Sequence, residues 1–172
     1  MKKVISLFAI AAISLASFNA CSQDKSKRPS PPDKVTATNA KGATISIDYS
    51  QPSVKGRTIG KEIAPFGEVW RTGANESTKF EIDKEVTIGG KKLPAGKYGL
   101  YTIPGEKEWT IIFNKKADLW GSGGYSDADD ALRTVVAAKK APAFAEKMTF
   151  KLNNAGIISL MWGDVLVNFT VE

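Results

Sequence analysis

The sequence predicts an all-β domain, an antiparallel β-sandwich or jelly-roll-like fold of about eight to ten strands with one short helix. Two observations favour this fold class. Apolar and polar residues alternate with a period of two over most of the chain from Lys34 onward. Short groups of Gly, Pro and Asn interrupt this alternation at the spacing expected of strands joined by turns.

The first half of the domain contains the clearest alternation. In residues 43–50, Ile45, Ile47 and Tyr49 share one face and polar residues share the other. The turn-forming pair Gly89-Gly90 predicts a hairpin between two short strands. The strands expected in this half are residues 43–50, 78–83, 86–88, 98–103 and 109–114, with turns at 93–96 and 104–108.

The second half predicts strands at residues 148–152, 157–162 and 165–171. A turn at residues 153–156 joins the first two, and Gly163-Asp164 is expected to turn the chain again.

Two stretches depart from the strand pattern. Residues 57–69 are punctuated by Gly and Pro and predict a long loop. Residues 126–132 predict a short helix with Ser126 as its N-cap, because aspartates in the first turn suit the positive end of a helix dipole.

The N-terminus has the features of a signal peptide. Lys2 and Lys3 precede an apolar run at residues 4–16, which is too short to span a bilayer as a helix, and the small residue Ala20 ends the segment. Cys21 follows at the expected cleavage position and is the single cysteine of the chain. An exposed thiol in an oxidising compartment would be a liability, so we expect Cys21 to be lipidated.

These features divide the chain into a signal peptide at residues 1–20, a lipidated Cys and polar tether at residues 21–33, and one β domain at residues 34–172. The tether is Pro-rich and without apolar periodicity, so we expect it to hold the domain away from the lipid headgroups. The expected location is the cell envelope, lipid-anchored and facing the periplasm or the cell surface.

Composition excludes several kinds of site. The chain has no histidine, which rules out Ser-His-Asp catalysis and histidine-bound zinc. No phosphate-binding loop is recognisable, and the acidic run at residues 127–130 lacks the glycine and glutamate of a calcium loop. The net charge of +6 includes scattered lysine pairs and no basic stripe. We therefore expect no cofactor, no metal and no nucleic-acid partner.

The densest group of unusual residues lies at positions 51–57 and 70–76. Arginine forks bind carboxylates or phosphates, and tryptophan faces stack on sugars or cations. An alternative is that Arg71 forms a buried ion pair with Glu76 or Asp48 and only fixes a loop. The candidate ligand-binding residues are Arg57, Trp70, Arg71 and Asn75, with Trp120 and Tyr125 as aromatic walls.

The domain resembles the bacterial domain-of-unknown-function family number 2911 over residues 34–172. The resemblance rests on residues 49–52, 55–57, 67–75, 93–98, 109–114 and 125–133, above all on the string Trp-Arg-Thr-Gly-Ala-Asn that begins at Trp70. The family pattern more often has Arg where Gln51 stands. The resemblance implies an envelope lipoprotein with a compact β domain, and it implies no activity.

The leading hypothesis is a non-catalytic, membrane-anchored module that binds a glycan, a peptide or a small anion. One alternative is a hydrolase that uses carboxylates, with Glu68 or Glu76 as candidates. Another is a structural partner in an envelope complex, which would present an exposed apolar face. Carboxylates with a raised pKa in a cleft would favour the enzyme, and a site of arginine and aromatic residues would favour binding.

Overall fold

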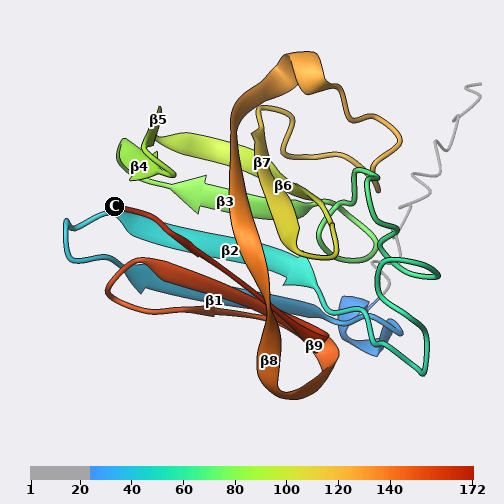
Figure 1. The fold of residues 1–172 in the computed structure, drawn as a ribbon. Helices are drawn as coiled ribbons and strands as arrows, with labels where there is room; N and C mark the ends of the chain where they lie inside the picture. Colours follow the sequence, from blue (N-terminus) through green and yellow to red (C-terminus); the bar gives the residue numbers. More distant parts are fainter. Residues whose placement is uncertain (1–23) are drawn as a thin grey trace, which may run out of the picture.

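A computed structural model describes residues 24–172, so the predicted signal peptide and Cys21 lie outside the described residues. The regular secondary structure of this part of the chain is almost entirely β-strand, as predicted (Figure 1). Its nine strands are β1 (Pro32–Thr38), β2 (Thr44–Ser50), β3 (Thr78–Ile82), β4 (Val86–Ile88), β5 (Lys91–Leu93), β6 (Gly96–Ile103), β7 (Glu108–Asn114), β8 (Asp130–Leu152) and β9 (Ile157–Thr170).

Seven strands form one antiparallel sheet in the order β1-β2-β3-β6-β7-β8-β9, and β4 and β5 form the predicted hairpin. The predicted alternation in β2 is confirmed, because Ile45, Ile47 and Tyr49 are all buried. The register places Val35 opposite Ile47 and Phe80 opposite Ile47 on the other side, so one face of the sheet is continuous and apolar. That inner face holds the main hydrophobic core.

Strands β8 and β9 bend together and fold across the rest of the sheet (Figure 1). The prediction of two strands separated by a turn at Gly163-Asp164 is wrong, because β9 continues through this point. Gly163 has a φ of 56°, and the register of β8 shifts between Lys140 and Ala145 and again between Ala145 and Thr149. A bulge on one strand opposite a left-handed glycine bends a strand pair and does not reverse it.

The bend brings the far edges of the sheet together into a sandwich. At one end, the amide of Val54 donates to the carbonyl of Glu146 at 2.8 Å, which joins the chain after β2 to β8. At the other end, Thr87 and Glu172 exchange backbone hydrogen bonds at 2.8 and 2.9 Å, which joins β4 to the chain after β9. The core between these layers is therefore enclosed on most sides by hydrogen-bonded strands.

The short helix predicted at residues 126–132 is wrong in extent. Only a 3-10 turn forms there, η2 (Asp127–Asp129), and the side chain of Ser126 makes no capping hydrogen bond. Asp130 already begins β8 because it pairs with Asn114 of β7. Strand pairing therefore outweighs the local preference for a helix start.

The predicted tether contacts the domain from Lys25 onward, because Lys25 pairs with Glu76. Asp24 is the N-cap of a 3-10 turn, η1 (Lys25–Lys27), and β1 starts at Pro32, two residues before the predicted domain boundary. The amide of Gln51 donates to the carbonyl of Pro31 at 2.9 Å. Within residues 24–172, no helix has the length and apolar character needed to cross a bilayer.

Candidate functional site

Trp70 belongs to the hydrophobic core. Its ring stacks on Trp162 with the ring centroids 5.1 Å apart, and its Nε1 donates to the carbonyl of Gly73 at 3.1 Å. Only 9% of the residue is exposed. A ligand would therefore have no open tryptophan face at this position.

Arg57 and Asn75 are both occupied with backbone carbonyls. Arg57 donates from Nε to Val54 at 3.1 Å and from Nη2 to Ser53 at 2.8 Å, which closes its own loop. Asn75, with a φ of 61°, donates from Nδ2 to Ser30 at 3.2 Å and so holds the N-terminal segment. The contacts of these two side chains are those of loop-stabilising residues.

Arg71 differs because its side chain has no hydrogen bond or ion pair with any of residues 24–172, and its Nε is buried. The alternative predicted from the sequence, a buried ion pair of Arg71 with Glu76 or Asp48, does not form. Glu76 pairs instead with Arg28, and Asp48 with Lys34. Burial lowers the pKa of Arg71, against an opposing effect of the nearby Tyr101.

Tyr101 lies beside Arg71 on the outer face of the sheet, opposite to the main core. The residue is fully buried, yet its hydroxyl also finds no hydrogen-bond partner among residues 24–172. Burial raises the pKa of Tyr101, and the neighbouring Ser77 side chain and the positive charge of Arg71 oppose that rise. A neutral phenol and a guanidinium therefore lie side by side with their donors unused.

Tyr125 packs on Tyr101, with the ring centroids 5.0 Å apart. Its hydroxyl donates to Asp130 at 2.8 Å and accepts from Arg133 at 2.6 Å. Burial, together with the hydrogen bond to Asp130, raises the pKa of Tyr125 to about 12. We call Arg71, Tyr101, Tyr125, Asp130 and Arg133 the arginine–tyrosine cluster.

The loop between β7 and β8 covers this cluster. The amide of Ser77 donates to the carbonyl of Leu119 at 2.9 Å, and the Ser77 hydroxyl donates to Ala117 at 3.0 Å. The loop crosses β6 at Gly99, where an added Cβ would lie 2.7 Å from both the Lys116 carbonyl and the Tyr101 ring. Glycine is therefore required at this crossing.

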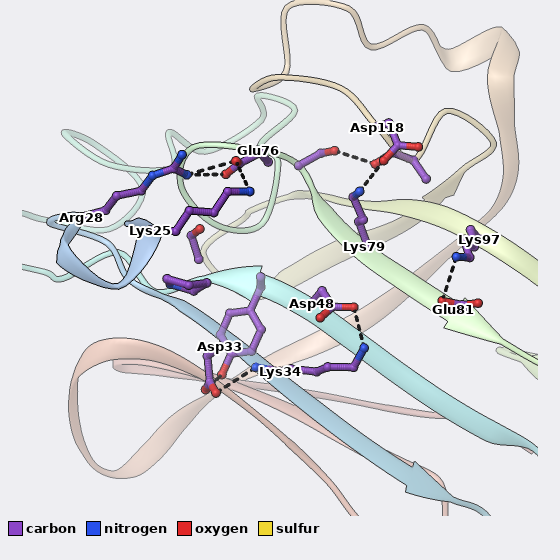
Figure 2. A pocket seen from close by; sticks show the side chains of 15 residues that line it. Lys25, Arg28, Asp33, Lys34, Asp48, Glu76, Lys79, Glu81, Lys97 and Asp118 are labelled. Carbon is purple, nitrogen blue, oxygen red and sulfur yellow. Dashed lines mark hydrogen bonds and ion pairs between the residues drawn. The ribbon is translucent and has the colours of Figure 1, made fainter. Parts of the chain in front are cut away.

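Next to this loop lies a hollow of about 480 Å³, bordered by η1, β1, β2, β3 and the β7–β8 loop (Figure 2). Basic and acidic side chains alternate along it and neutralise one another. Its ion pairs are Lys25 and Arg28 with Glu76, Lys34 with Asp48, Lys79 with Asp118, and Lys97 with Glu81. The hollow therefore has no net preference for an anion or a cation.

The carboxylate of Glu76 in this hollow is held in its ionised form. Burial alone would raise its pKa, but hydrogen bonds from its own amide, from Arg28 and from Lys25 lower the pKa to about 2. A general acid needs the opposite shift. The other candidate carboxylate, Glu68, is exposed and forms no ion pair with the described residues.

Asp130, from the acidic run at residues 127–130, is held by Arg133, Tyr125 and Asn114. Asp129 pairs with Lys116 at 2.7 Å. No group of three or more metal-ligating side chains occurs in residues 24–172.

Sequence reasoning included Arg71 and Tyr125 in the candidate site but missed Tyr101, Asp130 and Arg133. The sequence does contain an indication that Tyr101 is covered by another segment. In the strand predicted at residues 98–103, Tyr101 is in phase with Gly99 and out of phase with the buried Leu100. An aromatic residue on the outward phase of a strand indicates that another segment covers that face.

Comparison with known proteins identifies a family. The model of a family described as a protein of unknown function, DUF2911, matches residues 30–171. No curated protein and no solved structure matches the chain.

Proposed function

We propose that this chain, which belongs to the DUF2911 family, is a lipid-anchored protein of the cell envelope whose β domain binds an anionic group at the arginine–tyrosine cluster. The anionic group would be a carboxylate or phosphate of a glycan, a peptide or a small molecule. The anchor would be a lipid on Cys21, supported by the signal-peptide pattern that precedes this cysteine.

One observation carries the binding proposal, namely the unused donors of Arg71. Buried polar groups in proteins are almost always hydrogen-bonded, and each exception calls for an explanation. The Arg71 Nε and the Tyr101 hydroxyl are both buried and both lack a partner within residues 24–172. A guanidinium beside a phenol supplies several donors to one oxyanion, and hydrogen bonds to a charged acceptor are the strong ones.

The carboxylate hydrolase is less well supported than binding. Its candidate Glu76 is tied to Arg28 by two hydrogen bonds of 3.0 Å and has a pKa of about 2. That state favours a fixed structural carboxylate over a proton donor.

A structural partner in an envelope complex is favoured by a different surface. Phe66 and Phe144 are 44% and 57% exposed, which is unusual for residues of this size. Both lie near the loop that contains Ile59, since added Cβ atoms at Gly60 and Gly163 would meet the Phe66 ring and the Ile59 and Phe144 side chains. Phe144→Asp should abolish co-purification of any stable partner and leave binding at Arg71 unchanged.

The binding proposal is tested by NMR on the mature Cys21→Ser chain. The chain has four arginines, so its Nε–Hε region is simple, and Arg71→Met assigns the Arg71 signal. We expect inorganic phosphate, glucuronate or an acetylated dipeptide with a free carboxylate to shift that signal in a saturable way. Arg57→Met is the matched control and should leave the shift intact. A signal that none of the three probes moves at millimolar concentration contradicts the proposal.

The anchor is tested separately in cells. Radioactive palmitate should label the wild-type chain, and Cys21→Ser should abolish the label and release the protein from membranes or leave the precursor uncut. Unchanged labelling of the Cys21→Ser chain contradicts the anchor.

A further inference from the structure

The described chain begins beside an exposed tryptophan. Lys25 and Arg28 both bind Glu76, at 3.2 and 3.0 Å, and Glu76 pairs with Trp120 in an antiparallel β-bridge. Trp120 is 67% exposed, the most exposed large apolar residue of the described part. The docked N-terminal segment thus places the start of the domain next to an indole that faces solvent.

The position of the anchor follows from chain length. Asp24 follows Cys21 by three positions in the sequence, and three steps of extended chain span at most about 11 Å. A lipid on Cys21 would therefore keep Asp24 close to the bilayer surface. Because η1 is tied to Glu76, the whole end of the domain beside Trp120 would be held there as well.

The same end of the domain is basic. Hydrogen bonds connect five segments at this end, residues 24–31, 51–77, 104–107, 139–147 and the loop of residues 115–126 that contains Trp120. Together they carry thirteen basic and seven acidic residues, whereas the rest of residues 24–172 carries nine basic and eleven acidic residues. Figure 1 shows the loops after β2 and after β7 at the end where the N-terminal segment lies, away from the β4–β5 hairpin.

We propose that this end of the domain lies directly against the bilayer that holds the anchor, with Trp120 in the headgroup region. Tryptophan concentrates at membrane interfaces because its ring is apolar and its N–H is polar. Basic residues add attraction to anionic headgroups. The residues after Trp120, Gly121-Ser122-Gly123-Gly124, have small side chains that leave the indole free to enter.

This inference rests on the lipid anchor of the proposed function. It places Trp120 at the membrane, whereas the sequence predicted that Trp120 forms a wall of the ligand site. It also changes the expected role of the N-terminal segment. A tether bound to the domain by Arg28 does not lift the domain away from the headgroups but fixes which end faces them.

Quenching of tryptophan fluorescence tests the orientation. Lipidated protein, purified from cells, is reconstituted into vesicles of phosphatidylcholine and phosphatidylglycerol whose acyl chains are brominated near the headgroup. The other tryptophans, Trp70, Trp109 and Trp162, are at most 9% exposed, so Trp120 is the one within reach of bromine. We expect the brominated vesicles to remove roughly the share of emission that one of four tryptophans contributes.

Two variants provide the controls. Trp120→Phe should fold normally, because the side chain is exposed, and should show no quenching. Trp120→Phe combined with Ala95→Trp moves the indole to the exposed turn between β5 and β6 at the opposite end of the domain, and its emission should also be unaffected.

The outcomes separate the two proposals. Palmitate-labelled protein whose wild-type emission is not quenched, or whose Ala95→Trp variant is quenched equally, overturns the orientation and leaves the anchor standing. A chain without palmitate overturns the anchor and the orientation that rests on it. Neither result bears on the NMR signal of Arg71, which reports on anion binding alone.

Discussion

Arg28 binds Glu76 across 48 residues of sequence, with its Nη1 at 3.0 Å from each carboxylate oxygen. The contact joins the segment before β1 to the loop that precedes β3. It leaves Arg71, five residues before Glu76, without the carboxylate that the sequence suggested for it. Because Glu76 pairs with Arg28 and not with Arg71, one contact both forms the structural ion pair and leaves Arg71 as a candidate ligand-binding residue.

The first prediction is that Glu76 makes the fold sensitive to acid. Its pKa in the folded chain is about 2, below the ordinary 4.5, so its contribution to stability is complete above about pH 4.5 and is lost as the pH falls toward 2. After solvent screening of a carboxylate that is 34% exposed, we expect this contribution to be roughly 1–2 kcal/mol. Urea unfolding across this pH range measures it.

Glu76→Gln should lose less stability than the wild type between pH 5 and pH 2. Glu68→Gln is the matched control, because Glu68 is exposed and forms no ion pair with the described residues, and its profile should parallel that of the wild type. If the free energy of unfolding falls with pH in the same way for wild type and Glu76→Gln, the ion pair of Glu76 does not stabilise the fold.

The second prediction compares two arginines. Arg71→Met removes a buried donor that has no partner among residues 24–172, so the free energy of unfolding should stay within about 1 kcal/mol of wild type or rise. Arg57→Met removes hydrogen bonds to two carbonyls and should cost roughly 1 kcal/mol, or about 2–4 °C in melting midpoint. Melting curves measure both. A fall of 10 °C for Arg71→Met would indicate a structural role that the contacts do not reveal.

The third prediction compares two tyrosines of the arginine–tyrosine cluster. Tyr101→Phe deletes a buried hydroxyl without a described partner and should leave stability unchanged or raise it by up to about 1 kcal/mol. Tyr125→Phe breaks hydrogen bonds with Asp130 and Arg133 and should cost roughly 1.5–3 kcal/mol. Urea unfolding at neutral pH measures the free energy of unfolding of both variants and shows which of them is less stable. If Tyr101→Phe is the more destabilising, the Tyr101 hydroxyl has a partner in the folded protein.

Local alternation was enough to predict much of the fold, because side chains in β2 and β3 follow the period of a strand with one buried face. It was not enough to predict the strand at residues 133–147 of β8. This segment is rich in Ala and Lys and contains Pro142, so its strand conformation depends on pairing with β7 and β9. Strand propensity is weak in such a segment, and tertiary contacts decide.

The candidate site was predictable only in part, for a related reason. Sequence shows which residues can bind an anion but not which carboxylate each of them meets. Glu76 lies five residues from Arg71 yet pairs with Arg28, and this choice depends on how the N-terminal segment docks. The wrong assignment of a turn at Gly163 has a similar origin, because the bulge that makes it a bend lies on β8.

The last prediction concerns the crossing of the β7–β8 loop over β6. An added Cβ at Gly99 would lie 2.7 Å from the Lys116 carbonyl and 2.7 Å from the Tyr101 ring, and neither can move without displacing the loop or the cluster. Gly99→Ala should therefore cost roughly 1–3 kcal/mol, the range for overpacking a buried site, and lower the melting midpoint by about 3–10 °C.

Gly123→Ala is the matched control. Gly123 lies in the same loop, has no atom within 4 Å of an added Cβ, and should melt like the wild type. Limited proteolysis adds a second readout, because a loop lifted from Gly99 should be cleaved faster between residues 115 and 126 while the strands stay protected. Gly99→Ala would also be expected to shift the Arg71 Nε–Hε signal, since the loop covers Tyr101. If Gly99→Ala and Gly123→Ala have the same midpoint and the same cleavage rate, the loop does not rest on β6, and the buried position of Tyr101 needs another explanation.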